Sequence, residues 1–420
     1  MAEGAARPGR VQITGANLAG LALAARLARH GHRVTVVSAG APGERAAGYA
    51  LGGHPDVIVD DLPLATTLPA AWRDLAKKSG RPMAGFLNAA HLDLVEAPAA
   101  VHRFADGTEL ALPADRGGQV KALEAVFGRA QALAWAGLVD ECDALWQALR
   151  RHGAEAPFVA DDAPAELQPK LTMGQLADRL DDARLRQLWL SAASRAGSSD
   201  PVRAPALLAS RWSLERTFGR WQLLDQDSGL TQPLSVLTAL LLTRLDEAGV
   251  EVIELVDGYE FTADVVVDCL AVDPPRRRWP WQPRIEAVRP PTIGHEVVDA
   301  DDALGGHVRE VVEHSPSGHP VVTWTRRLDA DSALVTTHDH TRTGDPDPHW
   351  GWAADSIDGW MRRPPLHIEG GHWQVGAASH AGNEPWAELL SAALVSYQVH
   401  EHLTGADIRP TNRDAPRPPR

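Results

Sequence analysis

A short turn near the N-terminus carries the residue types with the clearest chemistry. The stretch "VQITGANLAG" (11–20) has Gly15 and Gly20 at the first and last positions of a G-x-G-x-x-G pattern. Gly15 allows a tight turn from a strand into a helix, and Gly20 lets that helix pack closely against the strand. The N–H groups at the start of such a helix bind the pyrophosphate of a dinucleotide. The spacing therefore predicts a dinucleotide-binding turn, with Leu18 among its cofactor contacts.

Two residues depart from the usual form of this motif. Asn17 stands in place of the middle glycine and adds a side chain whose amide could donate to a phosphate oxygen. Ser38 ends the next expected strand, where a carboxylate would accept two ribose hydroxyls. A serine hydroxyl offers one weaker contact. Taken alone, the turn leaves open whether a dinucleotide is bound.

A pair of histidines forms a second group of candidates. His338 and His340 lie in "THDHTRTGDPDPHW" (337–350), with Asp345 and Asp347 nearby. Their spacing puts both on one face of an expected strand, where an imidazole can act as a general acid or base. Two such histidines and a carboxylate can also share a metal ion. Charged residues at a loop end are the commoner arrangement, so we expect no metal site and keep both histidines as candidate catalytic residues.

The hydrophobic pattern indicates the elements that must position these residues. Residues 11–15, 17–30 and 33–38 predict a strand, a helix and a second strand, and 384–403 predicts a closing helix. The remaining expectations are helix over most of 62–150 and 114–250, a hairpin at 101–113, strands at 249–255 and 261–270, and β segments over 284–340.

This order predicts an α/β protein with a discontinuous, doubly wound Rossmann domain and an inserted α+β substrate domain. We expect residues 1–60, 235–275 and 366–408 in the dinucleotide-binding domain. The substrate domain would take residues 61–234 and 276–365, and residues 409–420 would form an irregular tail.

Composition excludes several classes of function. The 420 residues suffice for two intertwined domains, and a formal net charge of −14 disfavours binding to nucleic acid. No stretch of about 18 apolar residues predicts a membrane span, and two isolated cysteines are typical of a reducing compartment. We expect a cytoplasmic protein with a small-molecule substrate, no nucleic-acid partner and no integral membrane segment, and a homo-oligomer or a partner oxidoreductase stays open.

Several segments share their order with one known family. "GANLAGLALAARLARHGHRVTVV" is followed by "PGERA" (42–46), "FADGTELALPAD" (104–115), "TADVVVDCLAVDP" (262–274) and "WQVGAASHAGNEPWAELLSAAL" (373–394). This order resembles the phytoene desaturase-like branch of the FAD-dependent amine oxidase superfamily, from about residue 11 to 405. Each motif is short, so their common order carries the resemblance.

The resemblance implies an FAD-type Rossmann domain with FAD as cofactor. Its chemistry is hydride removal from a C–H or C–N bond to the flavin, or flavin-supported isomerisation of an apolar substrate. His380, in the closing turn, joins His338 and His340 as a candidate active-site histidine. The residues implied to contact the cofactor are Gly15, Asn17, Leu18 and Gly20 at the pyrophosphate, Ser38 at the ribose, Arg45 near the flavin or phosphates, and Gly376, Ala377 and Ser379 beside the ribityl chain and flavin.

Departures from the family pattern gather on the ADP half of the expected site. Glu44 stands where the family has a glycine, and its charge is unfavourable near a pyrophosphate unless it turns away or pairs with Arg45. The passage between the strands at 249–255 and 261–270 is also shorter than in the family.

Two main hypotheses follow. One is an FAD-dependent oxidoreductase that acts on an apolar small-molecule metabolite. The other is a flavin-free descendant of the fold, either a cofactor-independent isomerase or cyclase, or a non-catalytic partner of an oxidoreductase. NAD(P) as the sole cofactor is a third and weaker hypothesis.

Overall fold

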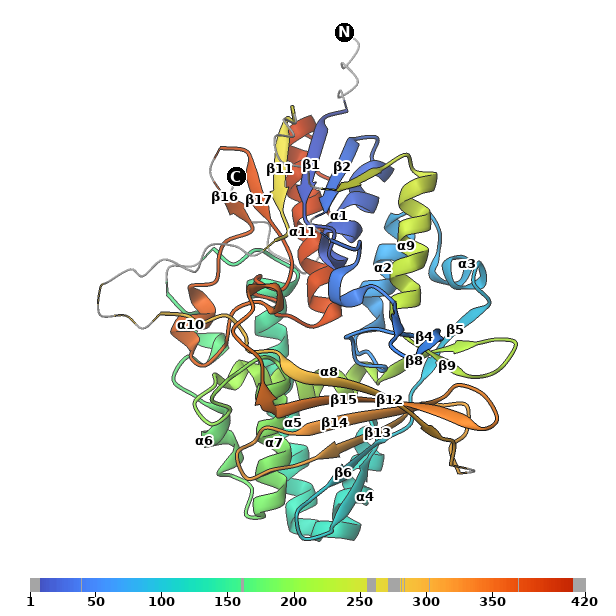
Figure 1. Cartoon of the computed structure of the whole chain (residues 1–420). Coiled ribbons are helices and arrows are strands. Elements are labelled where there is room, and N and C mark those ends of the chain that lie inside the picture. Colours follow the sequence, from blue (N-terminus) through green and yellow to red (C-terminus); the bar gives the residue numbers. More distant parts are fainter. Residues whose placement is uncertain are drawn as a thin grey trace.

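The structure of the protein is a computed structural model that describes residues 8–38, 40–159, 162–254, 262–270, 280, 282, 284–301, 303–368 and 370–410. One half of the molecule holds a parallel sheet with helices packed on it (Figure 1). The other half holds a second, antiparallel sheet beside a group of helices (Figure 1). The N-terminal strand and the C-terminal helix both belong to the first half.

Six strands form the first sheet, in the order β10-β2-β1-β11-β17-β16. All neighbouring pairs are parallel except β16 with β17. Val11 and Ile13 on the central strand are fully buried, as expected for a parallel sheet covered on its faces. The strands come from three separate stretches of the chain: β1 (Arg10–Thr14), β2 (Arg33–Ser38), β10 (Glu251–Glu254), β11 (Val265–Asp268), β16 (His367–Ile368) and β17 (His372–Gln374).

Four helices pack in this half: α1 (Leu18–Arg29), α2 (Pro69–Lys78), α9 (Ser235–Glu247) and α11 (Pro385–Thr404). Helix α1 contacts the other three and buries Leu18 to Leu27 almost completely, because small alanines let it approach the sheet and its neighbours closely. The β-α-β unit at the start and the closing helix are therefore confirmed, with bounds within two residues of those expected.

The second sheet has the order β12-β15-β14-β13-β6-β7. In β14 the burial alternates along the strand, so Val322 and Trp324 face the core. The expected hairpin and the β segments after residue 284 are confirmed. Their bounds are β6 (Ala100–Arg103), β7 (Glu109–Leu112), β12 (Pro291–Asp299), β13 (Arg309–Glu313), β14 (Val321–Arg327) and β15 (Ser332–Thr343).

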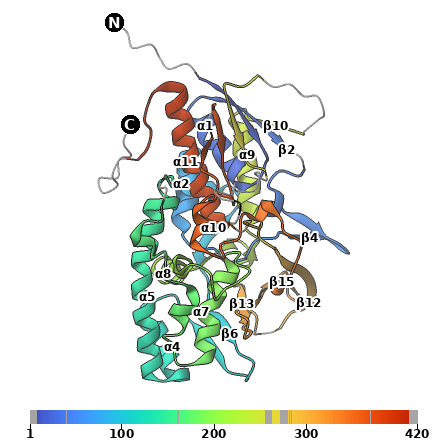
Figure 2. The same cartoon turned by 90° about the vertical axis from the view of Figure 1, so that its left-hand side faces the viewer.

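The helices of this half surround a tryptophan cluster. The Trp135 ring meets Trp189 and Trp212 edge to face, with centroids 5.4 and 5.2 Å apart. Helix α5 runs along one side of the molecule (Figure 2). The helices of this half are α4 (Arg116–Phe127), α5 (Arg129–Leu149), α6 (Met173–Ala177), α7 (Ala183–Arg195) and α8 (Ser210–Phe218). Two more, α3 (Met83–Asn88) and α10 (Ile357–Met361), pack with the core of the Rossmann half.

Several strands lie where the pattern predicted helix, and this part of the prediction was wrong. A three-stranded sheet joins β5 (Leu92–Glu96), β8 (Trp221–Asp225) and β9 (Thr231–Gln232). Such short strands are fixed by partners far away in sequence, which local periodicity does not report. A further hairpin, β3 (Tyr49–Leu51) with β4 (His54–Val59), projects from the body (Figure 2).

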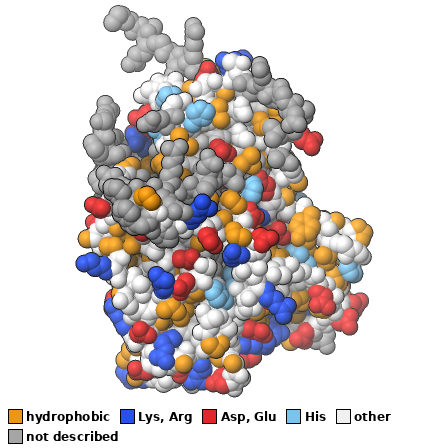
Figure 3. All heavy atoms as spheres, turned by 60° about the vertical axis from the view of Figure 1, so that its left-hand side comes forward, with side chains coloured by type: hydrophobic (Ala, Val, Ile, Leu, Met, Phe, Trp, Pro, Cys, Tyr) orange, Lys and Arg blue, Asp and Glu red, His pale blue; other side chains and the backbone are white. Residues whose placement is uncertain are grey.

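Other expectations remain predictions. The turn between β10 and β11 falls on residues 255–261, and most of the tail falls on 411–420, both outside the described residues. The division into two domains likewise stays a prediction. No helix in the described ranges has the length and apolar character needed to cross a bilayer. Acidic and basic side chains are interspersed over the lower part of the face in Figure 3.

Because the start of α1 packs closely on the turn before it, adding one methyl group at Gly20 should destabilise the folded protein. A Cβ built on Gly20 would lie 2.4 Å from the Gly15 carbonyl oxygen, so we expect Gly20→Ala to lower the free energy of unfolding by about 1–3 kcal/mol. Gly137 in α5 is exposed with open space around it, so Gly137→Ala should instead raise it by about 0.5–1 kcal/mol. Urea unfolding measures both. Equal changes in the free energy of unfolding for the two substitutions would contradict the close packing of Gly20 against Gly15.

Candidate active site

Asn17 caps α1 and ties it to a neighbouring strand. Its Oδ1 accepts from the Gly20 N–H at 3.0 Å, which satisfies one free donor of the first turn. Its Nδ2 donates to the Cys269 carbonyl at 2.5 Å, just after β11. The amide expected to reach a phosphate oxygen is used inside the protein instead, because β11 ends beside the turn.

Two more polar groups of the ADP half are bonded internally. The Gly43 N–H donates to the Ala16 carbonyl at 2.6 Å, so the loop after β2 pairs with the turn. The Ser38 hydroxyl, 3% exposed, donates to the Gly40 carbonyl at 2.6 Å. The hydroxyl expected at the ribose therefore bonds within its own turn.

The two turns expected at the cofactor lie against each other. A Cβ on Gly376 would lie 3.7 Å from Nδ2 of Asn17, so the turn after β17 borders the start of α1. The Gly376 N–H is fixed by the Ser391 hydroxyl at 3.1 Å. Ala377, predicted beside the flavin, is buried. Gly351 packs against the backbone of Ala377, because a Cβ built on Gly351 would lie 2.3 Å from the Ala377 carbonyl oxygen.

Unpartnered polar atoms remain at this junction, and they fit a dinucleotide. Within the described ranges the fully buried Ala19 N–H has no protein acceptor. The buried Ser379 hydroxyl likewise has no hydrogen-bond partner there. A donor at a helix start suits a phosphate oxygen, and a buried hydroxyl suits a polar atom of a bound cofactor.

Arg45 and Glu44 do not pair with each other. The Arg45 guanidinium contacts the Glu388 carboxylate of α11 and stacks over the Trp350 ring, 4.7 Å from its centroid. Glu44 turns away towards His349, with Oε2 3.5 Å from Nδ1. Burial raises the pKa of Glu44, and the nearby Glu388 adds to that rise. Arg45 is thus held in place by α11 and is neutralised from that side.

Arg45 opens onto a pocket between the two halves, which we call the polar pocket. It encloses about 700 Å³ of space and is partly open to solvent. Residues from the turn after β2, the ends of α7 and α8, strands β14 and β15 and the start of α11 meet here. Its charged, imidazole and indole groups belong to Arg45, Asp61, Arg195, Arg211, Glu384, His338, His340, Trp324 and Trp350.

His338 and His340 both line the polar pocket, as their spacing on β15 predicted. Burial lowers the pKa of His338 to about 3, and the charges of Arg195 and Arg45 add to this. Burial lowers the pKa of His340 well below its ordinary value too. Both imidazoles are neutral near pH 7. Nε2 of His338 is buried without a hydrogen-bond partner among the described residues.

His380 lies in a neighbouring pocket, which we call the apolar pocket. It has about 460 Å³ of empty space, part of it open to solvent. Its apolar lining residues include Leu149, Leu207, Leu208, Leu214, Trp360, Ala381 and Trp386, and Arg211, Arg363 and Glu384 also line it. The His380 ring packs against Phe158 and Trp360, and burial lowers its pKa to about 3. The structure therefore separates His380 from the other two candidate histidines. Asp345 and Asp347 do not line the polar pocket, and no group of three metal-ligating side chains occurs in the described part of the chain.

Sequence reasoning missed the buried arginines and their carboxylates. Arg211 on α8 pairs with Glu215 at 2.9 Å and with Glu384 at the start of α11. Burial lowers the pKa of Arg211 to about 10, so it stays charged near pH 7. The local sequence around Glu384 does not reveal Arg211 as its partner, because the two residues lie far apart in the chain.

Comparisons with known proteins agree with this architecture. The family described as an NAD(P)-binding Rossmann-like domain matches residues 13–78. Hydroxyneurosporene desaturase of Cereibacter sphaeroides is 30% identical over 348 residues, which cover 70% of this chain and 67% of the relative. The chain belongs to the phytoene desaturase-like family of FAD-dependent oxidoreductases.

Other members and neighbours of this family extend the comparison. Phytoene dehydrogenase of Streptomyces griseus is 34% identical over 212 residues, 47% of this chain and 40% of that protein. The structure of putrescine oxidase bound to putrescine shares the fold, with a TM-score of 0.59 and 16% identity over 95% of this chain and 100% of that one. The family and the fold support a flavin or related dinucleotide cofactor.

The buried neutral histidine predicts a pH-dependent stability. His338 must stay neutral in the folded chain but takes a proton below pH 6.5 when unfolded, so stability falls as the pH drops from 6.5 towards 3. The free energy of unfolding falls by about 1.4 kcal/mol per pH unit below pH 6.5. Between pH 7 and pH 5 the wild type should therefore lose about 2 kcal/mol more of this free energy than His338→Gln.

Urea unfolding at both pH values measures the difference. His54 is exposed on β4, so His54→Gln should keep the pH slope of the wild type. Equal slopes for wild type and His338→Gln would show that the imidazole is not held neutral.

Proposed function

We propose that the chain is an FAD-dependent oxidoreductase that acts on a largely apolar small molecule. The observation that carries the proposal is the closeness of Gly376 to Asn17, whose Nδ2 a Cβ on Gly376 would approach to 3.7 Å, because it brings together the two turns that the family uses for its cofactor. The names of the relatives, a desaturase and a dehydrogenase, support removal of hydrogen from the substrate.

The residues at this junction would hold the cofactor. Ala19 and the start of α1 would face the pyrophosphate, and Ser379 with Gly376 and Ala377 would face the flavin side. Arg45 would border the flavin from the polar pocket. When bound, FAD supplies the acceptor for a hydride from a C–H or C–N bond.

The protein's own residues would position the substrate and exclude water. Trp324 and Trp350 cover parts of the polar pocket, and Trp360 and Trp386 cover parts of the apolar pocket. Loss of two hydrogens also releases a proton, which His338 or His340 could accept. With a pKa of about 3, His338 is a weak base, so hydrogen bonding to the substrate is its better-supported role.

One observation favours a flavin-free descendant as the second candidate. The contacts of Asn17 with Cys269, Gly43 with Ala16 and Ser38 with Gly40 use polar groups that the ADP half of FAD would otherwise meet. In that case the pockets alone would carry an isomerase or cyclase activity.

A charge placed at the turn separates the two candidates. Asn17→Asp keeps an oxygen that can cap α1 but adds a negative charge beside the expected pyrophosphate. Repulsion of about 1–4 kcal/mol at 4 Å predicts FAD binding weaker by about fivefold or more than for the uncharged cap Asn17→Ser. FAD titration, followed by flavin absorption and fluorescence, measures this.

The visible spectrum of the purified wild type is the first measurement. Bands of oxidised flavin in the purified protein, or bands that stay with the protein after added FAD has been removed by gel filtration, support the proposal. A colourless protein that gains none favours the second candidate. Equal FAD affinities of Asn17→Asp and Asn17→Ser would show that the pyrophosphate does not sit at this turn.

A further inference from the structure

The Arg195 guanidinium lies in the polar pocket without adequate partners. It is the last residue of α7, and its side chain is 11% exposed. Its ion pair is with Oε1 of Glu310 at 3.5 Å, and no hydrogen bond to it is found among the described residues. A guanidinium carries five N–H donors, and this side chain remains partly accessible from the pocket that it lines. Arg195 therefore has hydrogen-bonding capacity to spare on the pocket side.

A second donor with the same property faces the same space. Nε2 of His338 is buried, has no hydrogen-bond partner in the described ranges, and belongs to a side chain that lines the pocket. The His338 ring is held edge-on by Trp324, with centroids 4.8 Å apart. A neutral imidazole can carry its proton on Nε2 and so donate. Arg195 lies near enough for its charge to act on His338.

The carboxylates that line the pocket do not meet this demand. Glu384 is held by Arg211 and by the Trp386 indole N–H at 2.6 Å. Asp61 accepts from the Tyr49 hydroxyl at 3.0 Å. Arg45 and Arg211 are paired with carboxylates at the start of α11. Arg195 instead shares Glu310 with Arg220 and has no hydrogen bond to it. A ligand acceptor with negative charge would give Arg195 the hydrogen bonds that Glu310 does not.

The adjoining apolar pocket indicates what such an acceptor would be attached to. The two pockets share Arg211, Asn383 and Glu384 in their linings, so they adjoin each other at these residues. Leucine and tryptophan side chains dominate the apolar side. A ligand that reaches into both would have an apolar body and one polar end.

We propose that the substrate is an apolar molecule that carries a carboxylate, bound by Arg195 and His338 with its hydrocarbon body directed towards the apolar pocket. This deepens the proposed oxidoreductase function and rests on it for the reaction, but the carboxylate site is a binding property of its own. An Arg–carboxylate contact is a strong, charge-assisted hydrogen bond.

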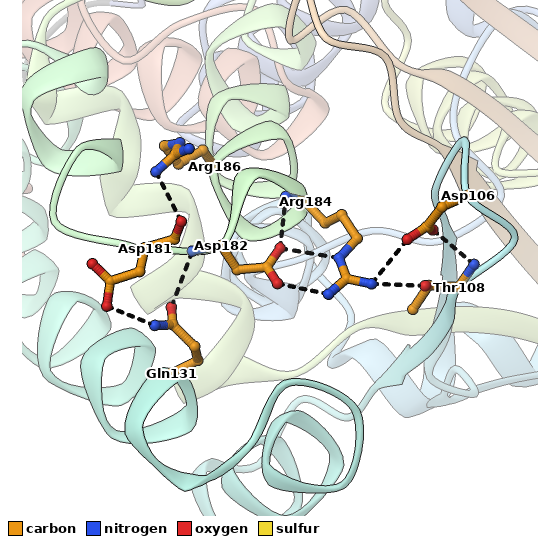
Figure 4. Close-up of polar contacts among 7 residues, drawn as sticks. All are labelled: Asp106, Thr108, Gln131, Asp181, Asp182, Arg184 and Arg186. Atoms are coloured by element: carbon orange, nitrogen blue, oxygen red, sulfur yellow. Dashed lines mark hydrogen bonds and ion pairs between the residues drawn. The ribbon is translucent and has the colours of Figure 1, made fainter.

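Helix α7 is fixed at the end opposite Arg195. Asp182 accepts from the backbone N–H of Arg184 at 2.8 Å, and the Arg184 guanidinium bridges Asp182 and Asp106 (Figure 4). Arg186, on the same helix, does not line the polar pocket and donates to the backbone carbonyls of Leu180 and Asp181; its contact with Asp181 is drawn in Figure 4. Arg186 thus offers a matched control.

The test compares decanoate with decanol, two probes with the same chain and different head groups, by isothermal titration calorimetry on the whole chain. We expect wild type to bind decanoate at least tenfold more tightly than decanol. Arg195→Gln should weaken decanoate about tenfold and leave decanol unchanged. Arg195→Lys should retain most of the preference, and Arg186→Gln all of it.

Other outcomes would overturn the proposal. One is an equal affinity of wild type for decanoate and decanol. The other is an equal loss of affinity for both probes in Arg195→Gln, because that result would indicate a merely structural role for Arg195. If circular dichroism shows that Arg195→Gln is unfolded, His338→Phe removes the second donor while keeping a ring against Trp324. It should weaken decanoate alone, and an unchanged preference would count against the site.

Flavin content separates this proposal from the function it rests on. A colourless protein that still prefers decanoate overturns the cofactor and supports the carboxylate site. A flavin-bearing protein without the preference overturns the carboxylate site alone.

Discussion

The side chain of Asn17 holds together three parts of the chain that are far apart in sequence. It caps α1 through Gly20, bonds the carbonyl of Cys269 after β11, and borders Gly376 after β17. A glycine at this position would lack all these contacts, although it would leave the backbone more open to a phosphate. Asn17 in place of glycine therefore fixes the junction between the two ends of the Rossmann half, but it leaves the backbone less open to a ligand.

In the other half of the molecule, a buried carboxylate joins side chains from different elements. Glu310 on β13 binds the Arg220 guanidinium and accepts from the Trp324 indole N–H at 2.7 Å. Burial by itself raises the pKa of Glu310, but Arg220 and Arg195 outweigh this, so its pKa lies below the ordinary value. Arg220 and Trp324 both contact Oε2 of Glu310. Arg195 instead lies 3.5 Å from Oε1, which has no hydrogen-bond partner among the described residues. That unequal sharing leaves Arg195 available to the pocket.

The sequence predicted the parts of the fold that are governed by local patterns. The strand, helix and strand at 11–38 followed from apolar periodicity, and the hairpin β6–β7 from its D-G turn. Strands β5 and β8 could not be predicted in this way, because Leu92 pairs with Asp225 across the intervening helices. The same holds for the site. The spacing of His338 and His340 indicated a shared face, but the links from Arg45 to Glu388 and from Arg211 to Glu384 depend on tertiary structure alone.

These links have a common physical consequence for binding. Each arginine of the polar pocket is held by a carboxylate from another element, so removing charges from water is compensated before any ligand arrives. Side chains fixed in this way lose little further conformational entropy on binding. The neutral His338 adds a donor without adding charge, since another cation among three arginines would be repelled. A pocket built from paired ions and one neutral donor can therefore recognise a single negative group.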